Sequence, residues 1–216
     1  MKKENHNPDY NCPLCPRLVE FRDEWREKEP AWHNGPVDTW VAKAGDDQVK
    51  MMIIGLAPGL RGANLTGRPF TGDYAGDLLY STLLKFGFAQ GAYKASPDDE
   101  MQLVDCAITN AVRCVPPQNK PVGEEINNCR PFLLSTLARF PNLKALVTLG
   151  KIAHDTTTRA MGERVAAHPF KHAGQTEMGR YTVFSSYHCS RYNTNTNVLT
   201  PEMFEKVFHS VREYVD

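Results

Sequence analysis

The segment VKMMIIG, residues 49–55, decides the predicted fold. It is a short apolar run bounded by turn residues, as expected for a strand that is buried on both faces of a parallel sheet. Three similar segments follow it, separated by helical sequence: CAITNAV at 106–112, residues 144–149, and YTVFSSY at 181–187. Strands that alternate with helices predict an α/β fold, here a doubly wound, mostly parallel four-stranded sheet flanked by helices.

Helical sequence fills most of the remaining chain. Proline at a first helical position predicts helices from Pro16 to about Pro30 and from Pro201, the latter capped by Thr200. Helical spacing of apolar residues also covers residues 77–86, 124–140 and 151–161. We expect Pro131 to kink or divide the second of these. Residues 31–48 are predicted to form a loop, and residues 162–180 a basic loop region.

Length and composition predict one domain over residues 1–216. Hydrophobic residues at 41% and charged residues at 23% are enough to build a core, which excludes wholesale disorder. No apolar run approaches the roughly 20 residues that cross a bilayer, and no apolar stretch follows the basic first residues as in a secretory signal. We therefore expect a cytoplasmic protein without a membrane partner. Basic and acidic residues number 25 each, so any DNA partner requires a local patch rather than net charge.

A glycine-rich segment, GLAPGLRGANLTGRPFTGDYAG at 55–76, follows the first strand. It contains neither a G-x-G-x-x-G fingerprint nor a Walker loop, which excludes the usual nucleotide-binding motifs. What remains is one aromatic residue, Phe70, and one carboxylate, Asp73. A ring that stacks on a flat ligand, with an acid beside it, suits a nucleobase pocket. The alternatives are equally open: Phe70 in the core and Asp73 as the cap of the next helix.

Polar segments at three strand ends, residues 56–76, 110–117 and 188–197, are predicted to converge on one site, because ligands of such sheets bind beyond the carboxyl ends of the strands. Asn110 can pair with an amide-like base edge or satisfy a turn. His188 is the stronger candidate, since the polar residues around it have little reason to be in a core. A His188–Cys189 nucleophilic dyad is disfavoured because adjacent side chains in an extended chain point apart.

The six cysteines of a chain in a reducing compartment are poor candidates for disulfides. Cys12 and Cys15 form a C-x2-C knuckle within residues 11–16, and Cys114 and Cys129 supply a second pair. Four thiolates can hold zinc or a [4Fe-4S] cluster, and spacing does not choose between them. A closed site of this kind is expected to staple the N-terminal segment to the chain after the second strand, rather than to transfer electrons.

Four motifs together resemble the uracil-DNA glycosylase superfamily, specifically its family 5 (type B) branch with an iron-sulfur cluster. They are GLAPG at 55–59, TGRPFTGDYAGDLLY at 66–80, TNAVRCVPPQNKP at 109–121 and SYHCSRYNTNTNVLT at 186–200. The order and spacing agree over residues 12–208. The resemblance implies a DNA-repair enzyme that flips uracil, and other deaminated or damaged bases, out of double-stranded DNA. The enzyme hydrolyses the glycosidic bond, leaves an abasic site and is expected to act as a monomer.

The resemblance also implies a role for each motif residue. Phe70 stacks on the flipped base and Asn110 reads its edge, within a base-binding set that includes Gly55 and Ala57. His188 stabilises charge on the departing base, and Asp73 becomes the carboxylate for the water or the cationic sugar. The expected duplex-inserting residues are Ser190, Arg191, Tyr192 and Asn193, and the expected ligands of a [4Fe-4S] cluster are Cys12, Cys15, Cys114 and Cys129.

Ala57 stands where many relatives carry Asp, Asn or Glu to orient water, a polar group that this branch commonly lacks. Two positions depart from the family pattern: Cys189, where Pro or Val is more frequent, and Tyr192, where Gln is more frequent. The apolar side chain at 57 predicts weaker water activation and a broader choice of base. Two rival functions stay open: an α/β hydrolase of free nucleosides, and a DNA-binding module whose zinc or iron-sulfur knuckle only shapes its surface.

Overall fold

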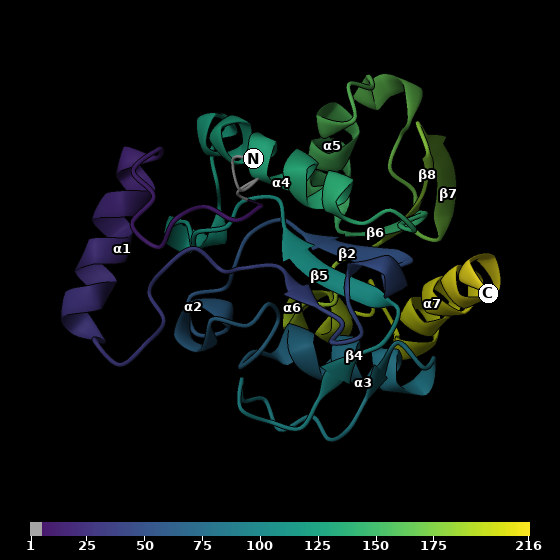
Figure 1. The fold of residues 1–216 in the computed structure, drawn as a ribbon, viewed down its shortest axis with the longest axis horizontal. Helices are drawn as coiled ribbons and strands as arrows, with labels where there is room; N and C mark the ends of the chain where they lie inside the picture. The colour runs from purple at the N-terminus through teal and green to yellow at the C-terminus, as the bar shows by residue number, and fades with distance from the viewer. Residues whose placement is uncertain (1–5) are drawn as a thin grey trace.

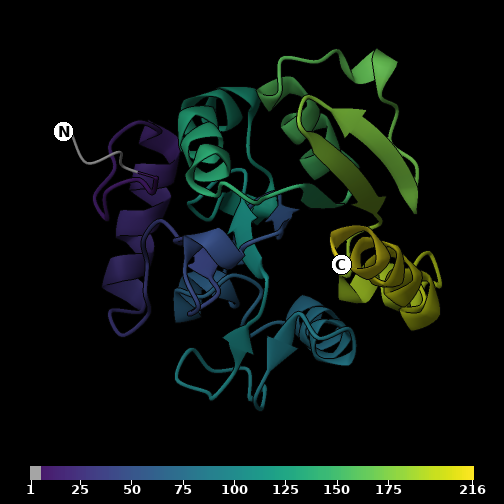
Figure 2. The same ribbon diagram turned by 45° about the vertical axis from the view of Figure 1, so that its right-hand side comes forward.

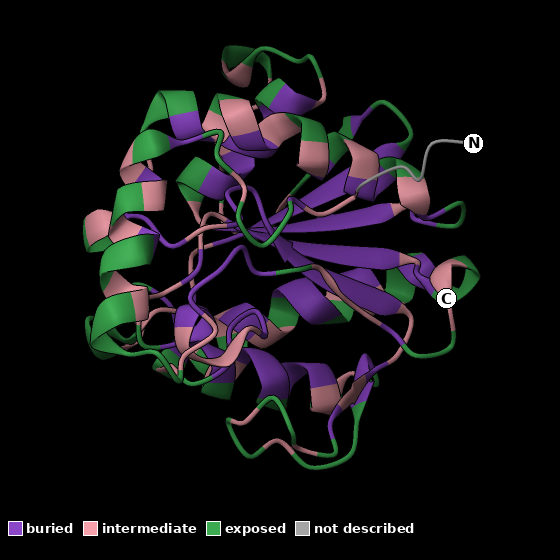
Figure 3. Ribbon diagram, turned by 60° about the vertical axis from the view of Figure 1, so that its left-hand side comes forward, coloured by how far each residue is buried: buried purple, intermediate pink, exposed green. Residues whose placement is uncertain are grey.

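The computed structural model describes residues 6–216 and contains a six-stranded mixed sheet between two layers of helices (Figure 1). The strand order is β1-β5-β2-β6-β8-β7, and the helices lie above and below the buried sheet in Figure 3. The sheet strands are β1 (Trp40–Val41), β2 (Met51–Gly55), β5 (Cys106–Asn110), β6 (Ala145–Leu149), β7 (Gly174–Met178) and β8 (Tyr181–Ser186). The predicted α/β class is confirmed.

The longer helices are α1 (Pro16–Lys28), α3 (Tyr74–Lys85), α4 (Gly123–Arg139), α5 (Lys151–Ala160) and α7 (Pro201–Val215). Two short helices, α2 (Ala63–Thr66) and α6 (Arg191–Asn195), lie in the loops after β2 and β8. A separate hairpin of β3 (Ala89–Gln90) and β4 (Gln102–Leu103) packs beside α3. Helix α1 lies on one flank of the molecule and α7 on the other (Figures 1 and 2).

The four central strands are the ones that the apolar runs predict, and all four are parallel. Alternate side chains of β2 enter opposite cores: Met51 and Ile53 face α3 and α7, whereas Met52 and Ile54 face α4. Helix α7 begins as predicted, with Thr200 Oγ1 accepting the backbone N–H of Met203 at 3.2 Å. Among the described residues, none of the helices has the length and apolar character needed to cross a bilayer.

Three predictions about the secondary structure were wrong. The sheet has six strands rather than four, because β1 lies in the predicted loop 31–48 and β7 in the predicted basic loop 162–180. Both pair antiparallel at the edges, where one half-solvated face removes the need for an apolar run. Of the two alternatives for Pro131, a kink or a division of α4, division does not occur. A proline removes one backbone hydrogen bond, and the buried Leu133 and Leu137 hold the rest of this helix in the core.

The carboxyl ends of the central strands lie at one edge of the sheet, where Gly55 pairs with Asn110 and Leu149 with Ser186. From β2 the chain crosses to β5 on one side, and from β5 it crosses back to β6 on the other. Strand β2 is therefore the topological switch point, where open α/β sheets bind their ligands.

Candidate functional site

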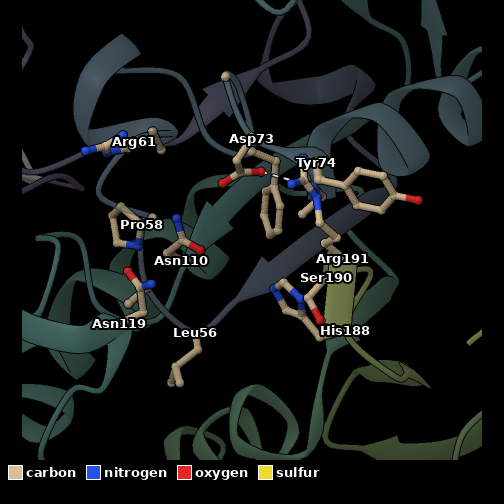
Figure 4. Close-up of a pocket in the computed structure, with 16 residues that line it drawn as sticks. Leu56, Pro58, Arg61, Asp73, Tyr74, Asn110, Asn119, His188, Ser190 and Arg191 are labelled. Carbon is tan, nitrogen blue, oxygen red and sulfur yellow. Dashed lines mark hydrogen bonds between the residues drawn. The ribbon is translucent and has the colours of Figure 1, made fainter. Parts of the chain in front are cut away.

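A cavity of about 660 Å³ opens at this edge, at the ends of β2, β5 and β8 (Figure 4). The three predicted polar segments all contribute to it, so their convergence is confirmed. Its walls combine polar side chains with backbone of the glycine-rich loop. The lining residues are Leu56, Ala57, Pro58, Gly59, Arg61, Ala63, Phe70, Gly72, Asp73, Tyr74, Ala75, Asn110, Asn119, His188, Ser190 and Arg191.

Phe70 and Asn110 meet over the end of β2. Gly55 makes this possible, since a Cβ there would lie 2.7 Å from Phe70 Cζ and would clash with Asn110 Oδ1. Asn110 is only 2% exposed, and its Oδ1 has no hydrogen-bond partner within residues 6–216. A buried amide oxygen without a partner is costly, which indicates that a ligand supplies the missing donor.

Phe70 occupies a strained backbone conformation with φ of +52°. Its carbonyl oxygen lies where a Cβ of Gly76 would stand, so only glycine at 76 allows this approach. Non-glycine residues in the left-handed region persist where the surroundings hold them, and such positions cluster at functional sites. The ring is therefore placed by the loop backbone rather than by core packing alone.

A buried ion pair holds this loop in place. Arg68 donates to both carboxylate oxygens of Asp99, at 2.7 and 2.8 Å, and to Thr71 Oγ1 at 2.8 Å. Its guanidinium stacks over the Trp40 ring, 4.5 Å from the centroid. The hydroxyl of Tyr80 donates to the carbonyl of Pro69. The residues on both sides of Phe70 are thus fixed, and neither Arg68 nor Asp99 was singled out from the sequence.

Asp73 is the N-cap of α3, as one of the two sequence interpretations proposed. Its Oδ1 accepts the backbone N–H of Ala75 at 3.1 Å. Its Oδ2 points at Gly59 and Gly62, where a Cβ at either position would crowd it. Asp73 also lines the cavity, so capping the helix and facing a ligand are not exclusive. Burial raises the pKa of this carboxyl, although the backbone N–H groups of Gly76 and Ala75 oppose the shift.

His188 lies across the cavity from the Phe70 ring. The two ring centroids are 6.1 Å apart with planes inclined by 33°, and no solid packing separates them. Burial lowers the pKa of His188, which favours the neutral imidazole. A neutral imidazole carries one N–H donor and one acceptor nitrogen, so His188 can donate a hydrogen bond to a ligand oxygen.

Sequence reasoning missed two further polar residues of the cavity, Arg61 and Asn119. Asn119 follows Gln118, and both adopt positive φ, +57° and +56°. This loop conformation brings the Asn119 amide to the same cavity as the Asn110 amide (Figure 4). The only signal in the sequence was the position of Asn119 inside the proline-rich motif after β5, which predicts a loop and not the direction of a side chain.

The segment Ser190–Asn193 opens α6 at the mouth of the cavity. Ser190 caps this helix, and Arg191 lies over the Tyr74 ring at 5.2 Å; both Ser190 and Arg191 line the cavity. Tyr192 and Asn193 do not line it. Tyr192 is 74% exposed, and Asn193 donates to the carbonyl of His188 at 2.8 Å. Asn193 thus orders the His188 backbone, and Tyr192 projects into solvent.

Cys189 is fully buried beneath the pocket and donates a 3.4 Å hydrogen bond from Sγ to the carbonyl of Ala75. Burial raises its pKa to about 12, so the side chain stays a thiol at neutral pH. A thiol in this state is a poor nucleophile. The geometry agrees with the sequence analysis in disfavouring a dyad with His188.

The four predicted ligand cysteines lie close together in space, although they come from three separate segments of the chain. Cys12, Cys15, Cys114 and Cys129 line one small cavity between the start of α1, the loop after β5, and α4. Burial raises the pKa of Cys114 to about 12 and that of Cys129 to about 11, and the charges of neighbouring cysteines add to both shifts. Within residues 6–216, no three His, Cys, Asp or Glu side chains converge closely enough to hold a single metal ion.

The sequence as a whole is similar to a known class of proteins. Residues 42–212 match the model of the uracil DNA glycosylase superfamily, and the chain belongs to this superfamily. Within it, the chain is 40% identical over 201 residues to the type-5 uracil-DNA glycosylase of Thermus thermophilus, which covers 91% of this chain and 90% of that protein. It is 36% identical to the type-5 enzyme of Pyrobaculum aerophilum, over 91% of this chain and 86% of that protein.

Similarity to the type-4 branch is lower. The type-4 uracil-DNA glycosylase of Pyrobaculum aerophilum is 33% identical over 155 residues, 71% of this chain and 63% of that protein. The protein is a member of the type-5 branch, as its motifs predicted.

Proposed function

We propose that this protein removes uracil, and other deaminated or damaged bases, from DNA by hydrolysing the bond between base and deoxyribose. The observation that carries the proposal is the convergence of Phe70, Asn110 and His188 on one cavity that also contains a half-buried carboxyl group, Asp73. The substrate would be a nucleotide extruded from duplex DNA, since the reacting bond is inaccessible inside the base stack. We expect the protein to act as a monomer.

Base recognition would use stacking and one amide. Phe70 offers a ring face that tolerates several bases, and Asn110 Oδ1 accepts an N–H from the base edge, which satisfies its missing hydrogen bond. Gly55 gives both side chains their room, and Ala57 adds an apolar wall. Because only a few directional contacts would reach the base, we expect the pocket to accept several deaminated bases.

Bond cleavage places positive charge on the sugar and negative charge on the departing base. The neutral His188 would donate an N–H to the base oxygen where negative charge develops, at no cost of reorganisation. Asp73, held by the backbone of α3, would face the cationic sugar and orient the attacking water. No side chain needs to act as a strong base, because charge stabilisation supplies the catalysis.

We further propose that the four cysteines hold a [4Fe-4S] cluster. Their donor set fits, because four thiols from three separate segments line one cavity with an apolar wall. Their spread favours a cluster, which takes one thiolate at each of four iron atoms, over one zinc ion that requires all four at a single point. When bound, the cluster would supply a structural cross-link between the N-terminal segment and the loop that follows Asn110 at the end of β5. Iron and sulfide analysis of the purified protein distinguishes the two metals.

The decisive experiment is single-turnover release of uracil from a duplex with one uracil, read as strand cleavage after alkali. Asp73→Asn and His188→Ala should each slow release about a hundredfold or more while duplex affinity is kept. Asp77→Asn and His209→Ala are matched controls on exposed helix positions and should stay near the wild-type rate.

Full activity in both active-site variants would refute their assigned roles. Release of uracil from free deoxyuridine, but not from the duplex, would favour the nucleoside hydrolase. Duplex binding without any product would favour a non-catalytic DNA-binding module.

A further inference from the structure

Arg113 is a fully buried charged side chain that has no place in the base pocket. It lies between the end of β5 and Cys114, and none of its surface is exposed. Its guanidinium donates to Asn7 Oδ1 at 3.2 Å, to Thr39 Oγ1 at 2.7 Å and to Thr136 Oγ1 at 2.8 Å. Its Nε has no partner within the described chain.

All three of these partners are uncharged. No carboxylate of residues 6–216 lies within ion-pair distance of Arg113. The negative charge of Asp38 raises the pKa of Arg113, but Asp38 is an exposed residue. A buried cation without a counter-charge is costly, and proteins pair such groups or bind something of opposite charge beside them. Within residues 6–216, Arg113 therefore has no ion-pair partner, and Asp38 acts on it only at longer range.

The four-cysteine cavity is where that charge can arise. Arg113 directly precedes Cys114, and a thiolate at Cys129 would favour the charged form of its guanidinium. A second buried arginine, Arg22, lines the cavity itself. Thr136 lies two helical turns after Cys129 on the same buried face of α4. Four thiolates around a Zn²⁺ ion or around an oxidised [4Fe-4S] core carry a net negative charge in either case.

We propose that Arg113 is a buried counter-cation of a tetrathiolate metal centre, in addition to Arg22, and that its charge helps to retain the metal. The proposal rests on the proposed function only in taking the four cysteines as ligands. It does not depend on the reaction at the base pocket or on which of the two metals is bound. Arg113 acts on the metal through the electrostatic field and not as a ligand.

The test is the rate at which the metal-loaded protein, purified without oxygen, loses iron or zinc to excess EDTA. Arg113→Gln removes the charge but keeps hydrogen-bond donors. Thr136→Asp keeps Arg113 and gives its guanidinium a carboxylate partner, so it neutralises the same charge by a different route. Both should lose metal about tenfold faster than wild type, the lower end of what outer partners of metal ligands contribute.

Arg113→Lys and Thr136→Val are the controls. Arg113→Lys keeps the positive charge. Thr136→Val removes the hydrogen bond to Arg113 and adds no charge, with a side chain of similar size. Both variants should therefore stay within about twofold of the wild-type rate of metal loss. If iron is bound, the neutralised variants should also have a more negative midpoint potential, because the reduced cluster carries one more negative charge.

Wild-type retention in Arg113→Gln, or equal retention in Thr136→Asp and Thr136→Val, would overturn the proposal. If Arg113→Gln does not fold, the two Thr136 variants decide alone. A wild-type protein that binds neither metal when both are supplied would also overturn it. A metal-loaded protein that releases no uracil would refute the proposed reaction and leave Arg113 unaffected, because metal loss is measured without DNA.

Discussion

Arg68 and Arg113 are two buried arginines whose charges are balanced in opposite ways. Arg68 is 6% exposed and meets the completely buried carboxylate of Asp99 in a two-bond ion pair, surrounded by aromatic rings. Arg113 is fully buried and has only neutral partners among the described residues. In the loop that carries Phe70, the charge of the arginine is therefore balanced by a carboxylate of the protein. The charge of Arg113 would be balanced by the proposed metal centre.

The largest effect should follow from breaking the complete pair. Asp99→Asn leaves the Arg68 charge buried without a counter-charge, and we expect the free energy of unfolding to fall by about 3–5 kcal/mol, measured by urea denaturation at pH 7. Thr136→Val, which removes a neutral partner of Arg113, should cost only about 1 kcal/mol. Equal losses in the two variants would contradict the contrast between the arginines. The double variant Arg68→Met with Asp99→Asn should recover part of the loss.

The same pair should give a defined dependence on pH. The hydrogen bonds from Arg68 lower the pKa of Asp99 to about 2, below its value in an unfolded chain. A lowered carboxyl pKa stabilises the fold above the unfolded pKa of about 4, and this stability is lost as the pH falls through about 2. The difference in unfolding free energy between wild type and Asp99→Asn should therefore shrink by about 2 kcal/mol between pH 5 and pH 2. An unchanged difference would show that the Asp99 charge is not what stabilises the loop.

A smaller effect should follow from disturbing the pocket without touching a charge. In Gly55→Ala, the new Cβ lies against Phe70 and Asn110 and displaces both from the end of β2. Uracil release should slow about tenfold to a hundredfold, because small errors of position are enough to lose that much. Gly123→Ala is the control, since a Cβ at the start of α4 meets nothing within 4 Å. Equal rates in the two variants would mean that the base is not held between these side chains.

Much of the central fold was predictable because a strand that is buried on both faces has an apolar sequence. The strands β2, β5, β6 and β8 are buried along their whole length and read as apolar runs. The edge strand β7 could not be found in this way, because its residues alternate between exposed and half-buried. Strand β1 has only two residues, and its pairing with β5 depends on chain more than 60 positions away.

The candidate site was predictable to a similar depth. Because ligands of parallel sheets bind beyond the carboxyl ends of the strands, the segments of Asp73, Asn110 and His188 could be placed at one site. The family motifs then singled out those three residues. The positions of the strand ends do not predict the pairing of Arg68 with Asp99, which lies 31 positions later in the loop between β3 and β4. They also do not predict that the Asn119 side chain enters the cavity. Arg113 was visible only as a basic residue beside a cysteine. Its missing counter-charge became apparent only when its three partners were placed.

The smallest effect should come from the exposed rim of the pocket. Tyr192 is 74% exposed on α6 and packs on no core residue, so Tyr192→Ala should change the free energy of unfolding by no more than about 0.5 kcal/mol. If its ring stacks on a base of the opened duplex, the alanine variant should bind a duplex with an abasic site about fivefold more weakly, measured by fluorescence anisotropy. Tyr192→Phe keeps the ring and should bind as wild type does. Wild-type affinity in the alanine variant would place duplex contact elsewhere on the rim, and Arg191, which is held over Tyr74, would then be the next residue to change.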